Sequence, residues 1–291
     1  MRILLTGKSG QVGSALLTTL PPLGEVVARD RTRLDLANAE SIASAVRDVR
    51  PQVIVNAAAY TAVDQAEKEE TLAFRVNRDA AAVLSEEAKK LGALLVHFST
   101  DYVFDGEKSS PYLETDTPNP LSAYGRSKLA GEQAIQASGC RHLIFRTSWV
   151  YAAGGKNFML TMLRLAREGK PLRVVDDQHG APTSNLMIAA ALPSIVYRAA
   201  TDPALDGVYH MTAAGTTTWH GFARAILEAT STKADLLPIT SREYRSIARR
   251  PRNSLLNNGK LASRFQVLLP SWQDGMREVL RGCESSGTGR R

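Results

Sequence analysis

The sequence predicts an α/β protein with a doubly wound parallel sheet, followed by a smaller C-terminal α/β domain. Two observations support this fold class. Short apolar segments alternate with longer amphipathic segments through the first half of the chain, which is typical of a parallel sheet covered by helices on both faces. A glycine-rich turn also joins the first apolar segment to the first amphipathic one. After Trp149 the segments become irregular, which indicates a second domain.

The elements follow in chain order from their residue patterns. A buried apolar run opens the chain, Asn38 is a good N-cap for a helix, and Pro51 precedes another short apolar run. We expect strands at residues 2–6, 25–28, 53–55, 93–98, 143–146 and 207–211. We expect helices at residues 12–20, 38–49, 71–91, 121–138 and 186–200. The expected domains are 1–147 and 148–291, with 184–212 returning to the sheet.

Composition limits the class of protein. Of the 291 residues, 44% are hydrophobic and 22% charged, as in soluble globular proteins. The longest apolar stretch, 186–197, contains Pro193 and is shorter than the ~20 residues that span a bilayer. The first residues do not form a signal-peptide pattern. We therefore expect a cytoplasmic protein with no membrane partner, whose Cys140 and Cys283 stay reduced.

The net charge of +7 comes mostly from one arginine cluster and the tail. Five arginines lie within residues 242–252, and Tyr244 is the aromatic residue among them. Surfaces that bind single-stranded nucleic acid usually interleave aromatic side chains for base stacking. One bound diphosphate would explain the cluster equally well, and a solvated basic loop is the other interpretation. No nucleic-acid partner is expected.

The segment TGKSGQVG, residues 6–13, lies between the first expected strand and the first expected helix. Glycines at this point let the backbone turn sharply and approach a pyrophosphate, and the helix N-terminus offers N–H groups and a positive dipole. The spacing is one residue longer than the common dinucleotide fingerprint. The pattern predicts a Rossmann-like nucleotide site with Gly7, Gly10 and Gly13 in its loop.

Asp30 ends the second expected strand, where a carboxylate can accept hydrogen bonds from an adenosine ribose. This favours NADH. The arginines at positions 29, 31 and 33 could instead hold a 2′-phosphate, which favours NADPH, and a solvated charged turn is the third interpretation. Asp35, Leu36 and the alanines at 57–59 would lie beside the adenine and the pyrophosphate. The expected cofactor is NADPH or NADH.

Tyr124 and Lys128 lie four residues apart at the start of an expected helix, and therefore on one face. Tyrosine has a pKa of about 10, too high for easy proton transfer at neutral pH. A lysine ammonium one turn away and the helix N-terminus would lower that pKa and create a general acid. Thr100 ends the fourth expected strand, at the ligand-binding edge of a doubly wound sheet. Its hydroxyl could donate to the same substrate oxygen.

The glycine motif and the set of Thr100, Tyr124 and Lys128 resemble the extended short-chain dehydrogenase/reductase family. Longer strings narrow the resemblance to one branch of it: NAAAYTAVDQAE at 56–67, STDYVF at 99–104, HLIFRTSWVY at 142–151, DDQHGAPT at 176–183, TTTWH at 216–220 and RPRNS at 250–254. The resemblance implies reduction of the C4 ketone of dTDP-4-dehydro-L-rhamnose to dTDP-L-rhamnose. The product serves the biosynthesis of rhamnose-containing cell-surface polysaccharides, lipopolysaccharide included, and the smaller domain would bind the substrate.

The resemblance also implies roles for single residues. Tyr124 would protonate the C4 oxygen, and Lys128 would hold the nicotinamide ribose and tune Tyr124. The residues that would line the cofactor by position are Gln11, Val12, Asp30, Ala59, Tyr60 and Thr61. The residues that would contact the sugar nucleotide are Thr100, Asp101 and Trp149, with Arg250 or Arg252 at its diphosphate.

Members of the family are associated with Mg²⁺ at a dimer contact near the C-terminus, so a homodimer and Mg²⁺ follow as expectations. The carboxylate that would hold the ion does not align in this tail, and no metal-binding residue is predicted. The histidines form no i,i+4 metal pair and no catalytic triad. We interpret His97, His142, His210 and His220 as structural, while His179 could face the substrate.

Two related functions remain to be weighed. Nucleotide-sugar 4,6-dehydratases use Asp-Glu directly after the threonine, whereas Asp101 and Tyr102 follow Thr100 here, so a dehydratase is not expected. The regulatory β subunit of methionine adenosyltransferase also resembles these reductases and acts as a binding partner. An intact Tyr124 and Lys128 are compatible with that role, because a fold can keep its site and change its function.

Overall fold

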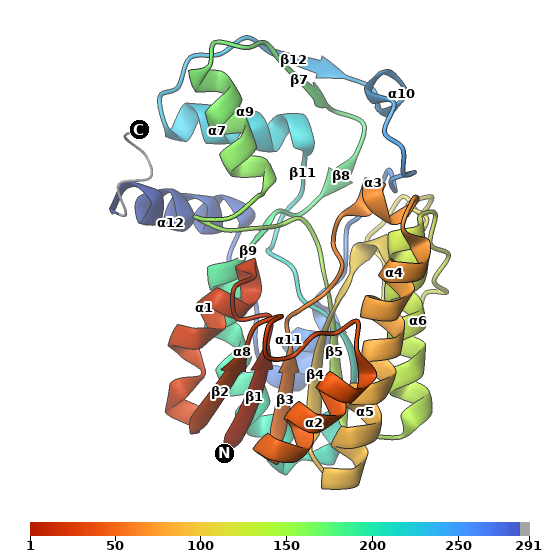
Figure 1. Ribbon diagram of the computed structural model, residues 1–291. Helices are drawn as coiled ribbons and strands as arrows, with labels where there is room; N and C mark the ends of the chain where they lie inside the picture. Colours follow the sequence, from red (N-terminus) through yellow and green to blue (C-terminus); the bar gives the residue numbers. More distant parts are fainter. Residues whose placement is uncertain (286–291) are drawn as a thin grey trace.

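The structure, a computed structural model, describes residues 1–285 and contains a parallel six-stranded sheet in the order β10-β5-β4-β3-β1-β2 (Figure 1). Every neighbouring pair in this sheet is parallel. The strand order reverses between β1 and β3, which is the topological switch point of a doubly wound sheet. The predicted fold class is thus confirmed. The strands are β1 (Arg2–Thr6), β2 (Glu25–Arg29), β3 (Val53–Asn56), β4 (Leu94–Thr100), β5 (His142–Thr147) and β10 (Gly207–His210).

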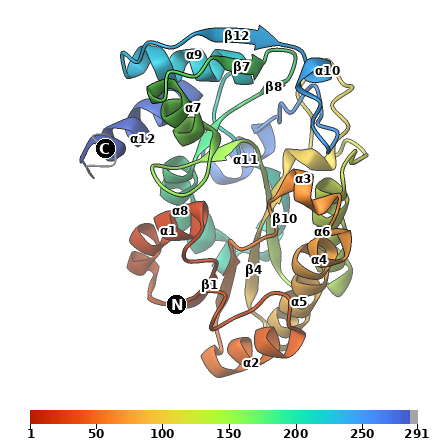
Figure 2. The same ribbon diagram turned by 45° about the horizontal axis from the view of Figure 1, so that its top comes forward.

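Helices cover both faces of the sheet (Figures 1 and 2). Strand β1 shows why, because Ile3 and Leu5 pack into one apolar core and Leu4 into the other. Alternate side chains of a strand point to opposite faces, so a strand apolar throughout needs cover on both. One face carries α1 (Gln11–Thr19) and α8 (Asn185–Thr201), which contact each other. The other carries α2 (Ala39–Val49), α5 (Ala80–Leu91) and α6 (Ala123–Ser138).

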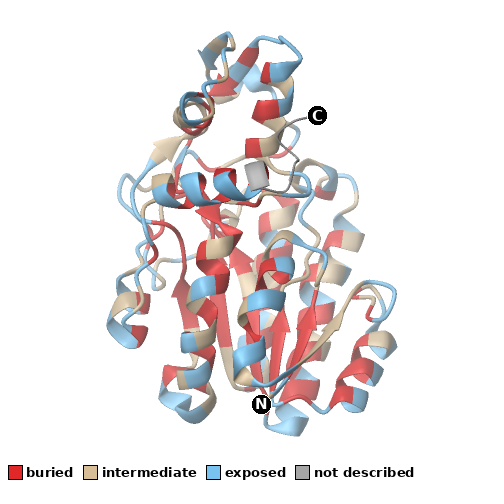
Figure 3. Ribbon diagram, turned by 90° about the vertical axis from the view of Figure 1, so that its left-hand side faces the viewer, coloured by how far each residue is buried: buried red, intermediate tan, exposed pale blue. Residues whose placement is uncertain are grey.

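The expected strands of the sheet and four of the five expected helices are present within two residues of their predicted bounds. The cap is as predicted, since the Asn38 side chain accepts a hydrogen bond from the Ser41 N–H at 3.1 Å. Figure 3 shows the buried residues gathered in the strands and on the helix faces turned toward them. In the described part of the chain, no helix has the length and apolar character needed to cross a membrane.

The segment predicted as one helix over 71–91 is more complex. It consists of α4 (Glu70–Phe74), a π-helical turn (Arg75–Asp79) and α5. A π turn holds one extra residue, which the periodicity of an alanine-rich stretch does not reveal. The turn lies against α6 at very short distance, because a Cβ atom on Gly131 would be 2.2 Å from the Asn77 carbonyl oxygen.

The second half of the chain adds a smaller layer beyond the carboxyl ends of the strands (Figure 1). Its small core joins α7 (Phe158–Arg167) and α9 (Trp219–Ala229) to the parallel pair β7 (Leu172–Val175) and β12 (Leu236–Ile239). α8 and β10, within the expected return at 184–212, lie with the sheet. The domain boundary near residue 148 stays a prediction. The remaining elements are α3 (Val63–Ala66), β6 (Val150–Tyr151), β8 (His179–Gly180), β9 (Thr183–Ser184), β11 (Thr217–Thr218), α10 (Ser241–Tyr244), α11 (Gly259–Phe265) and α12 (Trp272–Ser285).

Candidate active site

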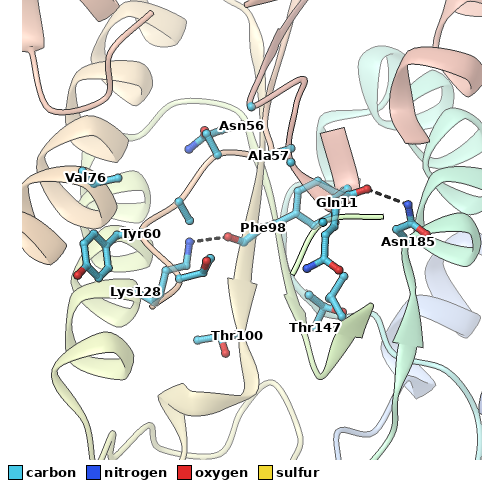
Figure 4. A pocket seen from close by; sticks show the side chains of 18 of the residues that line it. Gln11, Asn56, Ala57, Tyr60, Val76, Phe98, Thr100, Lys128, Thr147 and Asn185 are labelled. Carbon is cyan, nitrogen blue, oxygen red and sulfur yellow. Dashed lines mark hydrogen bonds between the residues drawn. The ribbon is translucent and has the colours of Figure 1, made fainter. Parts of the chain in front are cut away.

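A cavity of about 1140 Å³ lies where β1, β3, β4 and β5 end, at the switch point of the sheet (Figure 4). Ligands of doubly wound sheets bind in this crevice. Most of the predicted site residues line it: Gly7, Gly10, Gln11, Val12, Asp35, Leu36, Ala59, Tyr60, Thr61, Thr100, Asp101, Tyr124, Lys128 and Trp149. Four predicted residues do not line it: Gly13, Asp30, Arg250 and Arg252.

The glycine loop needs its glycines for different reasons. Gly7 has φ +69°, and a Cβ atom there would lie 2.8 Å from the Ala58 nitrogen, so glycine lets the loop pass the alanine segment. A Cβ atom on Gly13 would lie 2.1 Å from the Gly7 carbonyl oxygen, so this glycine lets α1 pack onto the loop. Gly10 is the N-cap of α1 and has no side chain to cap it. The first turn therefore keeps N–H groups for an anion.

The charged groups near the end of β2 are already paired. The Asp30 carboxylate accepts a hydrogen bond from the Thr32 hydroxyl at 2.6 Å and lies 3.0 Å from the Lys8 ammonium. These two contacts lower the pKa of Asp30 to about 2. Arg31, the next residue, lines the cavity. Arg31 lies 3.6 Å from the Asp35 carboxylate, which also lines the cavity, whereas Asp30 does not.

Asn77 fastens the cofactor-side loop to the helix that carries Tyr124. Its amide accepts from the Tyr60 N–H at 2.9 Å and donates to the Tyr60 carbonyl oxygen at 3.0 Å. It also donates to the Ser127 hydroxyl at 2.9 Å, and the side chain is buried. The sequence analysis missed Asn77, because its partners are 17 and 50 residues away. A second missed residue, Asn185, lines the cavity and donates to the Gln11 carbonyl oxygen at 2.9 Å (Figure 4).

The first turn of α6 positions Tyr124. Ser122 caps the helix, accepting a hydrogen bond from the Gly125 N–H at 3.1 Å, and Lys128 follows one turn later. Burial raises the pKa of Tyr124 to about 12, although a hydrogen bond with Thr100 acts against this. The direction is opposite to the expected lowering by Lys128. Tyr124 therefore keeps its proton at neutral pH, as a proton donor must.

The contacts of Lys128 differ from the expected effect of its charge on Tyr124. Its ammonium donates to the Phe98 carbonyl oxygen at 2.6 Å (Figure 4). It also lies 3.1 Å from Nε2 of His97. Burial lowers the pKa of Lys128 to about 8, opposed by the Glu132 carboxylate. His97 was interpreted as structural, yet it contacts Lys128 directly.

Two aromatic side chains form the far wall of the cavity. Trp149, with φ +50°, stacks on Trp219 with ring centroids 3.6 Å apart and planes 8° from parallel. Gly180 packs so closely on Trp149 that a Cβ atom would lie 2.4 Å from the indole ring. Trp219 begins α9, so the stack joins the end of the sheet to the smaller layer. Trp219 was not among the residues predicted for the site.

The arginines predicted for a diphosphate lie outside the cavity. Arg250 is 2.7 Å from the Asp64 carboxylate of α3, and its charge opposes the rise in the pKa of Tyr102 that burial causes. Tyr102 lines the cavity and packs edge-to-face on Tyr124. Arg252 is exposed. Arg250 thus supports the catalytic wall from outside, with its charge balanced by Asp64.

A tyrosine and a buried lysine one helical turn apart, beside a dinucleotide-type loop, match the arrangement that the resemblance to the extended short-chain dehydrogenases/reductases implies. Fold and site together define an oxidoreductase of this class.

Comparison with known proteins narrows the class. The chain matches the family described as RmlD substrate binding domain over residues 1–284. A dTDP-4-dehydrorhamnose reductase of Burkholderia thailandensis is 49% identical, covering 94% of this chain and 96% of its own. One of Escherichia coli is 44% identical, covering 96% and 97%. The crystal structure of the Bacillus anthracis dTDP-4-dehydrorhamnose reductase in complex with NADP is 35% identical with a TM-score of 0.92, covering 97% and 99%. The chain belongs to the dTDP-4-dehydrorhamnose reductase family.

Proposed function

We propose that this protein reduces the C4 ketone of dTDP-4-dehydro-L-rhamnose to dTDP-L-rhamnose, with NADPH as the hydride donor, in the biosynthesis of cell-surface polysaccharides. One observation carries the proposal: Tyr124, partly buried, lies with Thr100 and Lys128 at a cavity that a glycine loop opens. The relatives named above support the choice of substrate. We prefer this function to the regulatory-subunit interpretation because the relatives named above are reductases.

The chain's own groups suit a dinucleotide. The glycine loop packs so closely that Cβ atoms on Gly7 and Gly13 would collide with backbone atoms. Gly10, the N-cap of α1, leaves the start of the helix without a side-chain cap. When bound, NADPH supplies the hydride for the ketone carbon. The residues proposed to hold it are Gly7, Gly10, Gln11, Val12, Ala59, Tyr60, Thr61 and Lys128. Tyr124 gives its proton to the ketone oxygen, and the Thr100 hydroxyl orients that oxygen.

The preference for NADPH follows from the charges at the end of β2. Asp30 is neutralised by Lys8, and Arg31 lines the cavity. An arginine there would bind a 2′-phosphate through charge-assisted hydrogen bonds. The structure of the Bacillus anthracis relative holds NADP, which supports the same choice.

The residues proposed to bind the sugar nucleotide are chosen because they are unpaired or exposed. Oδ2 of Asp101 has no hydrogen-bond partner among residues 1–285, and we assign it a hydroxyl of the sugar. Trp149 packs against the sugar ring. Arg252 is assigned to the diphosphate, because Arg250 is paired with Asp64. A homodimer and a cytoplasmic location stay predictions, and no Mg²⁺ site is proposed because no group of three histidine, cysteine or carboxylate side chains within residues 1–285 could hold a metal.

The test is oxidation of NADPH and NADH, followed at 340 nm, with dTDP-4-dehydro-L-rhamnose made in situ. We expect rapid oxidation that depends on the sugar nucleotide and is faster with NADPH. Tyr124→Phe should lower kcat by about 100-fold or more, because the proton donor is lost. Its NADPH affinity should stay within a few-fold of wild type. Wild-type turnover by this variant would contradict the assignment, and NADPH binding without turnover by the wild type would favour the regulatory role.

A further inference from the structure

The Lys128 ammonium has two buried partners of different chemical character. The Phe98 carbonyl oxygen, 2.6 Å away, can only accept a hydrogen bond. The His97 imidazole is different, because Nε2 accepts in one neutral tautomer and donates in the other. The Lys128 and His97 side chains are each 1% exposed. His97 does not line the cavity, so solvent does not replace a partner that it loses, whereas Lys128 lines the cavity and can exchange a proton with solvent there.

His97 is itself backed by a chain of buried polar groups. Nδ1 of His97 lies 3.0 Å from the side-chain nitrogen Nδ2 of Asn56, and the Thr6 hydroxyl donates to the side-chain oxygen Oδ1 of Asn56 at 2.6 Å. These groups lead from the middle of β4 to the last residues of β3 and β1, and Thr6 and Asn56 are at most 2% exposed. Amide, imidazole and hydroxyl all carry both donor and acceptor capacity. The donor and acceptor roles in the hydrogen bonds from Thr6 through Asn56 to His97 can therefore be reversed.

Each direction fits one charge state of Lys128. With Thr6 donating to Asn56 and the Asn56 amide donating to Nδ1, the hydrogen of His97 lies on Nε2. Nε2–H then needs an acceptor, which is the lone pair of a neutral Lys128 amine. A charged Lys128 can only donate, so Nε2 must accept, Nδ1 must carry the hydrogen, and the Asn56 amide must turn its oxygen toward it.

We propose that His97 is a positioning residue that pairs with Lys128 in both charge states, by exchanging tautomers as the Asn56 amide turns. Lys128 can then lose and regain a proton without leaving a buried donor or acceptor unpaired, which would cost free energy. That Lys128 must lose and regain a proton rests on the proposed function. Tyr124 gives one proton to the ketone in each turnover, and an Nζ–H bond of Lys128 breaks as the O–H bond of Tyr124 re-forms, directly or through hydroxyls in the cavity. Solvent then returns the proton to the Lys128 amine.

Among the titratable groups around this site, Lys128 is the one that loses and regains the proton. Glu132, one turn further on α6, raises the pKa of Lys128 and is paired with Arg146 of β5 at 2.7 Å. Tyr124 on α6 keeps its proton, and Asp101 acts on Tyr124 from the turn after β4. Burial and the Lys128 charge hold the pKa of His97 far below its usual range. His97 therefore changes tautomer rather than charge.

The first test needs no substrate. Side-chain ¹⁵N NMR spectra of histidine-labelled protein distinguish the two neutral tautomers, and the His97 signals are those that disappear in His97→Gln. Between pH 6 and pH 10 we expect His97 to stay neutral while its hydrogen moves from Nδ1 to Nε2. In Lys128→Met one tautomer should persist throughout. A single tautomer in the wild type, or the same change in Lys128→Met, would overturn the proposal.

Kinetics provide the second test. His97→Leu removes the partner of Lys128, and we expect kcat to fall about 10- to 100-fold with KM nearly unchanged, because the lysine loses its position. His97→Gln can still accept or donate through its amide, so kcat should stay within several-fold of wild type. The matched control is His142→Gln, at the amino end of β5 and outside the residues that line the cavity, where kcat should not change. Equal kcat values and equal pH profiles in His97→Leu and wild type would overturn the proposed role of His97. Inactivity of the wild type itself would count against the proposed function alone.

Discussion

Among single residues, Asp101 combines burial with an unpaired oxygen. The side chain is 2% exposed and faces the cavity, and burial raises its pKa to about 6 because a carboxylate is poorly solvated there. Between the ordinary carboxyl pKa and about 6, the folded protein keeps a proton that the unfolded chain releases. The stability that this group contributes is therefore present at low pH and is lost as the pH rises through about 6.

Asp101→Asn should remove this pH dependence. The raised pKa corresponds to about 3 kcal/mol of unfolding free energy. We expect the variant to be more stable than wild type by up to that amount at pH 8 and about equal at pH 4, as measured by urea unfolding at both values. A stability difference that does not change with pH would contradict the burial argument. Reductase activity should fall, since the variant loses the proposed acceptor for the sugar.

The sequence predicts single residues where their chemistry depends on near neighbours. Tyr124 and Lys128 lie one helical turn apart, so their spacing alone brings them together, and the end of a strand places Thr100. The pKa of Tyr124 was predicted in the wrong direction, because burial depends on segments distant in sequence. His97 was missed for the same reason, since its contact with Lys128 joins residues 31 positions apart.

Among the elements, the π turn at Arg75–Asp79 has the clearest consequence for the site. Asn77 makes three hydrogen bonds there, to both backbone groups of Tyr60 and to Ser127. Asn77→Ala would leave these buried groups unpaired, at about 1–3 kcal/mol for each. We expect a loss of about 3 kcal/mol in urea unfolding and weaker NADPH binding, measured by fluorescence titration. Unchanged stability would show that water or a local shift replaces the amide.

The elements were predictable where periodicity and caps determine them. Apolar runs predict the strands of the sheet, and the Asn38 cap predicts the start of the helix that follows it. The π turn does not follow from a periodic pattern or a cap, and it lies against a residue distant in sequence, Gly131 of α6. The short strands of the smaller layer were also missed. Pairs such as β8 with β11 hold two residues per strand, too few for a periodic pattern.

At the scale of the whole molecule, the cavity is walled by both halves of the chain, and the Trp149–Trp219 stack is a point where they meet. The sequence predicted the change of architecture after Trp149. It could not predict this contact, because the partners are distant in sequence and belong to different layers. The stack also carries strain, since Trp149 has a positive φ that a bulky residue rarely adopts.

That geometry makes Trp219 a test of how the two halves form one site. Trp219→Leu removes the surface that holds the Trp149 ring, so we expect KM for the sugar nucleotide to rise about 10-fold or more, while NADPH affinity stays unchanged because the glycine loop lies on the sheet side. Tryptophan fluorescence reports the same event. Trp272 is buried in the main core, so a change in emission on substrate binding should come from the stack and should shrink in Trp219→Leu. Equal KM values for variant and wild type would mean that the substrate is held by the sheet side alone.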